Sequence, residues 1–212
     1  MSMSPFRYAF TIFALVCLTG FAVVSDSCLR PLADDWRQSL GFAPISLVEL
    51  QFYRVLTCLF LTAGAGSFFS SLAMLGFAVG MVESMVGTAQ TIKLFLSAHI
   101  VVLLMLSILI VLPACHIGVD AGRVLAGTYD VGPSAGYYGC LGGVIALRFK
   151  QKQSILLAVG IVVLAARLSF SAAQFADNPS VVSADIAHLI ALPLGWLATH
   201  WGFINCNGID LD

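Results

Sequence analysis

Two long apolar stretches without a charged side chain constrain this chain more than any other feature. No Asp, Glu, Lys or Arg lies between Arg54 and Glu83, and none lies between Lys93 and Asp120. A helix that crosses a bilayer needs about 20 mostly apolar residues, and both stretches exceed that length. Charged residues make up only 10% of the chain, whereas about a quarter is typical of a soluble domain. The sequence therefore predicts a polytopic α-helical membrane protein.

Apolar runs separated by polar segments predict an all-α bundle of six transmembrane helices, forming one domain over residues 1–212. The first run is interpreted as a retained helix and not a cleaved signal peptide, because the residues around Ser25 are a poor cleavage site. Residues 25–50 mix charges with apolar side chains, which favours an interfacial segment with a short helix on the membrane surface. The expected spans are 8–24, 52–82, 94–112 (ended by Pro113), 132–147, 154–173 and 184–203.

The positive charges of one short loop predict the orientation in the membrane. Arg148, Lys150 and Lys152 place the loop between the fourth and fifth spans in the cytoplasm. With six spans, both termini are then cytoplasmic, and the fourth and sixth spans both begin at the outer side. We expect the inner (cell) membrane as the location. The net charge of −1 offers no basic surface for nucleic acid.

Cysteine spacing gives no sign of a metal site. The six cysteines form no CxxC pair and no Cys/His cluster with metal-ligand spacing, so no metal is predicted. Cys28 and Cys115 fall in loops expected on the same side of the membrane. The sequence leaves open whether these two cysteines form a disulfide.

A serine opens the fourth span beside a row of small residues. Glycines 132, 136, 139 and 143 follow helical spacing, and small faces let helix backbones approach closely in a membrane. Ser134 lies at the start of this face, with Tyr138 one turn further on. By itself Ser134 fits a packing residue or a helix cap beside Pro133 as well as it fits a nucleophile.

A histidine in the sixth span gives this serine a candidate base. His188 lies at helical spacing from Ala191 and Gly195, at a depth similar to that of Ser134. A serine needs such a base at neutral pH, and neutral histidine has the right proton affinity. The alternative is a packing histidine bonded to a carbonyl or to Tyr138.

Three other histidines and two charged residues complete the polar inventory. Asp185 either orients the imidazole of His188 or caps the sixth helix, and capping is the preferred interpretation. Arg167 is the one charged residue expected inside the fifth span, and it is left without a role. Three histidines are interpreted as structural: His99, His116 and His200.

An ordered set of motifs along the chain resembles the rhomboid family. Gly132-Pro133-Ser134-Ala135-Gly136 resembles its GxSx motif, and Ala187-His188-Leu189-Ile190-Ala191, followed by Gly195, resembles its AHxxG motif. Upstream, Tyr53-Arg54-Val55-Leu56-Thr57 is similar to WR(L/Y)xT. Leu61-Thr62-Ala63-Gly64 is similar to LHAG, and Glu83 through Gly87 is similar to ExxxG. The resemblance covers about residues 8–203.

The resemblance implies an intramembrane serine endopeptidase that cleaves transmembrane segments of single-pass proteins within the lipid bilayer. Ser134 would be the nucleophile and His188 the general base, with the Tyr138 ring packed against His188 and Gly132 supporting the site. Such a serine-type reaction would need no organic cofactor. Glu83 would tie the inner end of the second helix to its neighbours. The long first loop would lie in the outer leaflet.

Two departures from the family pattern keep a second interpretation open. Ser67 and Ser71 occupy the positions of the HxxxN donors that support the oxyanion hole, and Ala191 stands where a glycine is usual. Losing one such donor in a soluble protease costs about 10²–10³ in rate. The alternative is a catalytically inactive rhomboid-like protein that binds membrane clients. A small transporter is disfavoured, because ionisable residues other than Arg167 and the histidines cluster at loop ends and not at mid-depth.

Overall fold

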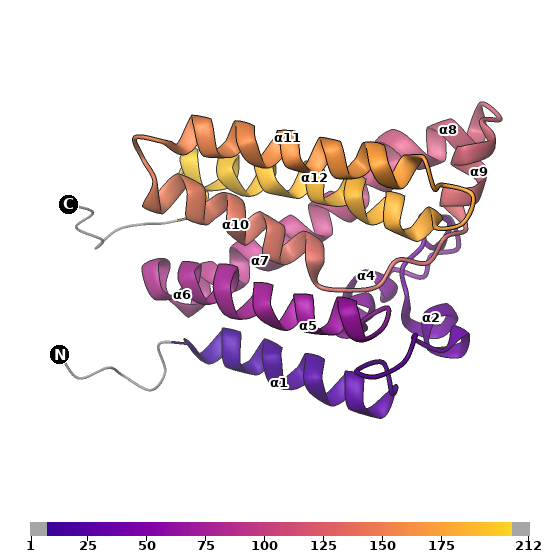
Figure 1. Cartoon of the computed structure of the whole chain (residues 1–212), viewed down its shortest axis with the longest axis horizontal. Coiled ribbons are helices and arrows are strands. Elements are labelled where there is room, and N and C mark those ends of the chain that lie inside the picture. Colours follow the sequence, from indigo (N-terminus) through magenta and orange to yellow (C-terminus); the bar gives the residue numbers. More distant parts are fainter. Residues whose placement is uncertain (1–7, 205–212) are drawn as a thin grey trace.

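A computed structural model of the protein describes residues 8–204, and these residues form a bundle of helices (Figure 1). The beginning of α1 and the end of α12 lie at the same end of the bundle. The π-helical turns Leu75–Val79 and Leu106–Val111 join α5 to α6 and α7 to α8. The helices are α1 (Ala9–Val24), α2 (Asp34–Leu40), α3 (Ile45–Val48), α4 (Arg54–Thr57), α5 (Ala65–Met74), α6 (Gly80–Val86), α7 (Thr88–Met105), α8 (Leu112–His116), α9 (Asp120–Ala126), α10 (Ser134–Arg148), α11 (Gln153–Ala172) and α12 (Pro179–His200).

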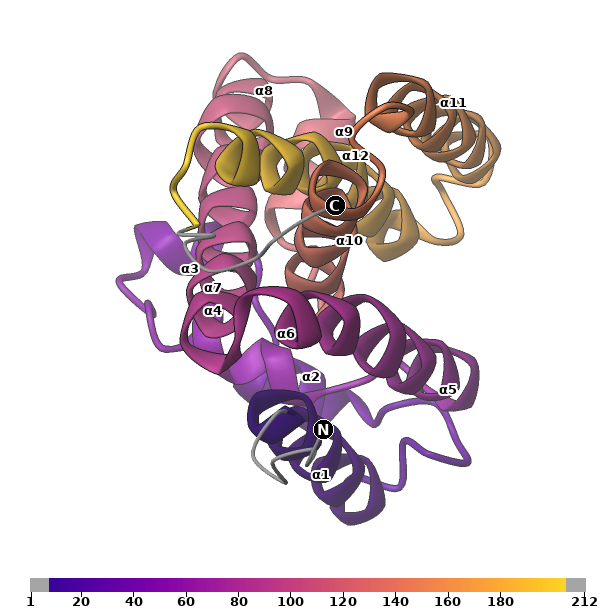
Figure 2. The same cartoon turned by 90° about the vertical axis from the view of Figure 1, so that its left-hand side faces the viewer.

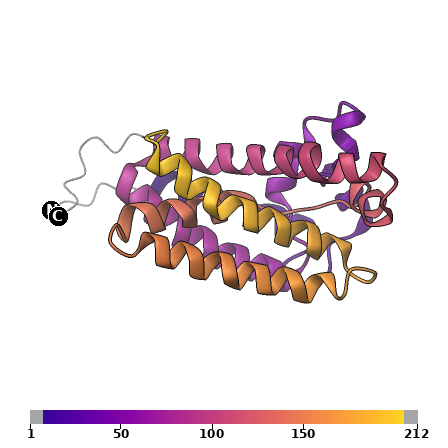
Figure 3. The same cartoon turned by 90° about the horizontal axis from the view of Figure 1, so that it is seen from above.

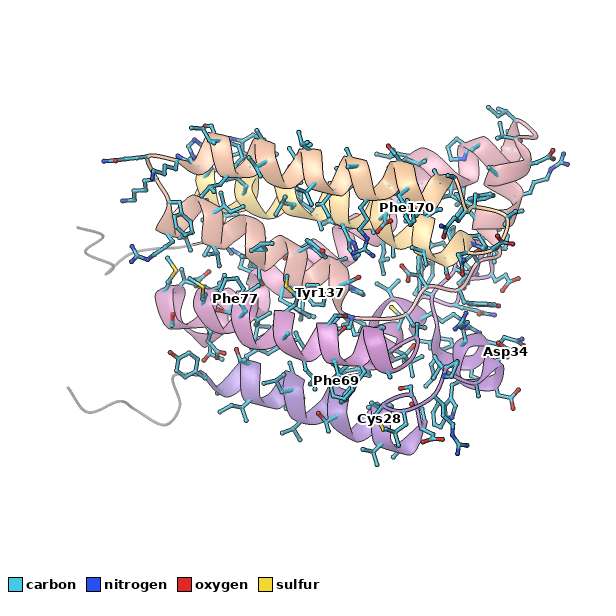
Figure 4. All side chains as sticks on the ribbon, in the orientation of Figure 1. Cys28, Asp34, Phe69, Phe77, Tyr137 and Phe170 are labelled. Carbon is cyan, nitrogen blue, oxygen red and sulfur yellow. The ribbon has the colours of Figure 1, made fainter. Side chains whose placement is uncertain are left out.

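Four continuous helical stretches are long and apolar enough to cross a bilayer. They are Ala65–Val86, Thr88–His116, Gln153–Ala172 and Pro179–His200. Exposed aromatic side chains such as Phe69 and Phe170 lie on their outer faces, where lipid would meet them (Figure 4). The protein is therefore a helical membrane protein.

Two further helices are shorter than a usual span. α1 has 16 residues and α10 has 15, so the expectation of six spanning helices stays a prediction for these two. α10 lies at the centre of the bundle, in contact with α6, α7, α11 and α12 (Figure 2). Because protein surrounds α10, non-helical backbone at its ends need not meet lipid, and a short helix is tolerated there.

The second span does not begin at residue 52 as expected. Residues 52–64 instead form the short helix α4, a 3-10 turn and a loop, and the long helix begins at Ala65. Gly64 ends this irregular stretch with a φ of +156°. A helix over all of 52–82 would be about 45 Å long, against a hydrocarbon core of about 30 Å. Leu59 and Leu61 are buried, so packing against protein, and not lipid, explains their apolar character.

The expected end of the third span and the expected start of the sixth are also wrong. The third span begins at Thr88 and continues through Pro113 to His116. The π-helical turn before Pro113 loosens the hydrogen-bond ladder into which its ring would otherwise clash. The sixth helix begins at Pro179, a favoured first helical residue, and not at 184. His188 consequently lies near the middle of α12.

The first loop is held against the bundle by backbone-directed hydrogen bonds. The guanidinium of Arg54 donates through Nη1 to the carbonyls of Gln38 and Gly41, and the Thr57 hydroxyl donates to Leu40 O at 2.8 Å. The loop contains the expected short helix, α2, which lies beyond the end of α1 (Figure 1).

The two cysteines considered for a disulfide do not form one. Cys28, in the turn that follows α1 (Figure 4), and Cys115, in α8, both carry free thiols. Cys206 lies outside the described residues.

Glu83 joins three helices at one end of the bundle. Its side chain is only 1% exposed and accepts hydrogen bonds from Phe10 N, Thr11 N, the Thr11 hydroxyl and the Thr88 hydroxyl, all between 2.6 and 2.8 Å. These donors lie at the first turns of α1 and α7, where N–H groups have no intrahelical partner and a negative charge is favourable.

We predict that Glu83→Ala lowers the free energy of unfolding by at least about 3 kcal/mol, because four donors lose a charged acceptor. Thermal unfolding in detergent micelles measures the loss. Glu49→Ala, which removes an exposed carboxylate, is the matched control and should be close to neutral. Equal melting temperatures for the two variants would contradict the role of Glu83.

Candidate functional site

Backbone contact between α10 and α12 positions the two candidate reactive side chains. A Cβ added to Gly195 would come within 2.7 Å of the Gly139 Cα, a separation that real Cβ atoms do not show. A Cβ on Gly142 would come within 2.7 Å of Trp196 N. Ala191 is fully buried beside this contact, so its methyl is accommodated and does not hold the helices apart. Figure 3 shows α12 (yellow) between α7 (pink) and α11 (orange).

All six residues predicted for the site line one cavity of about 390 Å³. The cavity lies where α10 and α12 begin. Those six residues are Ser67, Ser71, Gly132, Ser134, Tyr138 and His188. Charged residues that line the same cavity are Arg37, Asp130 and Arg167. A larger cavity of about 560 Å³ beside α1 and α7 is lined almost entirely by apolar side chains and offers no chemistry.

His188 is buried in this cavity with its ring stacked on Tyr138. The two ring centroids are 4.2 Å apart and the ring planes are inclined by 27°. Only 5% of the His188 surface is exposed. Neither ring nitrogen has a hydrogen-bond partner among the described residues, so the Ser134 hydroxyl is not bonded to the imidazole here. Catalytic hydrogen bonds are often long before substrate binds, so a resting site does not require this bond.

Ser134 is the first residue of α10, and the preceding turn fixes its place. Gly132 has a φ of +126°, which only glycine adopts readily, and its N–H donates to Cys58 O at 2.8 Å. Gly132 thus supports the turn, and its own N–H is not available to a ligand. The N–H groups of the first turn of α10 have no intrahelical acceptor, so the N–H of Ser134 is the backbone donor nearest the candidate nucleophile.

The serines at the positions of the expected oxyanion donors line the cavity, but both side chains have protein neighbours. The Ser67 hydroxyl accepts a hydrogen bond from Ala63 N at 3.3 Å. Ser71 is 3% exposed and lies near the Tyr137 phenol, which points from α10 towards α5 (Figure 4). Either hydroxyl would have to rotate to meet an oxyanion.

Asp185 does not cap α12, contrary to the preferred interpretation. The helix begins at Pro179, so Asp185 lies well inside it and is completely buried. Its Oδ1 is 2.8 Å from Nε of Arg167 on α11 and 3.7 Å from Nδ1 of His188. An unpaired arginine in an apolar span was the available signal for this ion pair, because a charge at that depth requires a partner.

Asp130 is a further cavity residue that the sequence analysis missed. It belongs to the segment before α10, and its backbone forms a two-way bridge with Phe42 of the first loop. Burial raises the pKa of Asp130 to about 6, against the opposing influence of the Val131 N–H, which donates to its carboxylate, and of the nearby Arg37 charge. No motif or period in the sequence indicated this carboxyl group.

The remaining histidines lie outside the cavity. His99 Nε2 is 2.8 Å from Val55 O, which ties α7 to α4. His200 stacks on Trp196 with ring centroids 5.1 Å apart, and His116 ends α8. Among residues 8–204, no three His, Cys, Asp or Glu side chains gather as metal ligands would.

A comparison with models of known protein families identifies the family of this chain. A family model described as Rhomboid domain matches residues 49–205, well over half of the chain. The chain belongs to the rhomboid family. No curated protein and no solved structure matches it. The rhomboid match begins before α4 and extends past α12, so it includes every cavity residue named above except Arg37.

We predict that Gly195→Ala lowers the free energy of unfolding of this rhomboid protein by about 1–3 kcal/mol or more, because the new methyl must displace the α10 backbone. Gly20→Ala is the matched control: Gly20 lies in α1 with nothing within 4 Å of an added Cβ, so this variant should be neutral or slightly more stable. Thermal unfolding of both variants in one detergent measures the contrast. A Gly195→Ala protein as stable as Gly20→Ala would show that α10 and α12 are not in backbone contact.

Proposed function

We propose that this rhomboid protein is an intramembrane serine endopeptidase that cleaves transmembrane segments of membrane proteins with a Ser134–His188 dyad. One observation carries the proposal: Ser134 and His188, on two helices in backbone contact, line the same polar cavity. Both imidazole nitrogens are free of other hydrogen bonds among the described residues, so the ring is available as a base.

The proposed reaction is acyl transfer to water in two steps. His188 accepts the Ser134 hydroxyl proton while the serine oxygen attacks the substrate carbonyl carbon. The oxyanion of the tetrahedral intermediate is stabilised by the Ser134 N–H and by the hydroxyls of Ser67 and Ser71 after rotation. The imidazolium then gives its proton to the leaving amine. A water molecule, deprotonated by His188, releases the acyl group and restores the serine.

The proposed substrates are single-pass proteins whose transmembrane helix unwinds near the outer face of the bilayer. The proposal places the protein in the inner membrane with its N-terminus in the cytoplasm. The loop containing Arg148, Lys150 and Lys152 then faces the cytoplasm. The cavity lies at the opposite end of α10 from this loop, so it would face the outer side.

The second candidate function is non-catalytic binding of membrane clients. Ser67 already accepts a backbone hydrogen bond, and no hydrogen bond joins Ser134 to His188 in the described structure. Cleavage of a model transmembrane substrate that is lost in His188→Ala but retained in His116→Ala would exclude this candidate. A wild-type protein that binds the substrate without cleaving it would favour it.

We predict that a fluorophosphonate probe labels the wild-type protein at Ser134, because a serine activated by a histidine reacts with phosphorus electrophiles. Ser134→Ala should abolish labelling, and His188→Ala should slow it by at least about 100-fold. The measurement is labelled protein per unit time, with mass spectrometry of the modified peptide.

Ser180→Ala is the matched control for the probe, because Ser180 lines the same cavity on α12 and has no proposed role. It should label at the wild-type rate. Equal labelling of the wild type and Ser134→Ala would refute the proposed nucleophile.

A further inference from the structure

A buried carboxylate lies close to a buried imidazole that has no hydrogen-bond partner among the described residues. Asp185 Oδ2 and both nitrogens of His188 lack a hydrogen bond among the described residues, and Asp185 Oδ1 is held only by an ion pair with Arg167. Asp185 Oδ1 and His188 Nδ1 are 3.7 Å apart, on the same side of α12. Buried polar groups in native proteins nearly always find a partner. A side-chain movement of less than 1 Å would bring His188 Nδ1 within hydrogen-bonding distance of Asp185 Oδ1.

The ion pair with Arg167 gives this carboxylate a fixed position. The guanidinium Nε is 2.8 Å from Asp185 Oδ1, and Arg167 comes from α11, the helix that packs on α12. The Arg167 side chain is 50% exposed, whereas the Asp185 side chain is 1% exposed. Arg167 can therefore reach the polar cavity while compensating the buried negative charge. The same carboxylate oxygen lies near both the guanidinium and the imidazole.

A purely structural ion pair does not explain this placement. Arg167 could meet an exposed acid at lower desolvation cost, because burying a charge is expensive even when it is paired. The acid instead lies completely buried, one helical turn before the histidine that the proposed reaction uses. The location of Asp185 is explained if its carboxylate also serves His188.

We propose that Asp185 is a positioning residue for His188, and that Arg167 holds its carboxylate in place. This inference rests on the proposed protease function. Asp185 accepts the N–H of His188 Nδ1, which fixes the tautomer whose Nε2 carries the lone pair. Nε2 is then the nitrogen that receives the Ser134 proton. The Tyr138 ring limits rotation of the imidazole from its other face.

The charges balance through the reaction without a proton reaching Asp185. His188 becomes an imidazolium when it takes the Ser134 proton, and the Asp185 carboxylate stabilises that transient positive charge. The proton returns through Nε2 to the leaving amine, and Nδ1 keeps its own proton throughout. Asp185 therefore acts through His188 and need not contact the substrate.

The first test compares Asp185→Asn with Asp177→Asn. Asp177 lies exposed in the turn before α12, so its variant removes the same charge without touching His188. We expect Asp185→Asn to reduce kcat for a model transmembrane substrate by about 10²- to 10⁴-fold with KM unchanged, because the imidazole loses the partner that fixes its tautomer. We expect Asp177→Asn to match the wild type. Equal kcat values for the two variants would overturn the inference.

The second test separates positioning from charge compensation. The double variant Arg167→Gln/Asp185→Asn removes both charges and therefore leaves no unpaired arginine. It tests the inference even if the single variant Asp185→Asn fails to fold. If Asp185 only neutralises Arg167, the double variant regains the wild-type kcat, and the inference is wrong. If Asp185 positions the imidazole, the double variant folds with a melting temperature near that of the wild type and stays about 10²- to 10⁴-fold slower.

A readout independent of activity keeps the two proposals distinguishable. Nitrogen-15 NMR of histidine-labelled protein, assigned with His188→Ala, reports which ring nitrogen of His188 carries the proton. We expect Nδ1–H in the wild type and a mixture of tautomers in Asp185→Asn. The same tautomer distribution in both would overturn the inference even if the protein cleaves substrate. Failure of the wild type to label or cleave would overturn the protease proposal alone.

Discussion

The backbone contact between α10 and α12 is the constraint on which the rest of the structure depends. Hydrophobic exclusion cannot drive helices together within lipid, so close packing of small residues must do so. Gly139 and Gly195 have no side chain at this contact, and any Cβ at Gly195 would collide with the facing backbone. This approach brings Ser134 and His188 to one cavity, and it leaves α10 enclosed by its neighbours (Figure 2).

Buried polar groups give the bundle its specific connections. Glu83 joins the first turns of α1 and α7 to α6, and Arg54 holds the first loop through backbone carbonyls. His99 ties α7 to α4. Each of these polar side chains would be costly in an apolar interior without its partner, so each pair specifies one arrangement of helices. His188 differs, because both of its ring nitrogens lack a hydrogen-bond partner among the described residues and the side chain lines a cavity.

The accuracy of the sequence predictions follows the physical origin of each signal. Small-residue spacing in the fourth and sixth spans indicated helix faces that can approach closely, and a lone imidazole in an apolar run indicated the candidate base for Ser134. The second span was expected to begin at residue 52 because the stretch after it is apolar. Burial against protein and exposure to lipid select the same apolar side chains, so the sequence does not distinguish them. Pro113 was expected to end the third span, but the π-helical turn before it accommodates a residue without an N–H, and the helix continues. Asp185 was interpreted as a cap because the start of α12 was expected five residues too late.

The sequence by itself determined that the chain lies in a lipid bilayer and is helical. It also determined the rhomboid resemblance and the candidate residues Ser134 and His188. Those conclusions depend on composition, period and short motifs, which are local properties of the chain. Only the tertiary structure decided that Arg167 meets Asp185, that Asp130 enters the cavity, and that the Gly132 N–H is already occupied by Cys58. These contacts join residues on different helices or loops. Their distances follow from how the helices pack and tilt, and no pattern along a single segment encodes that geometry.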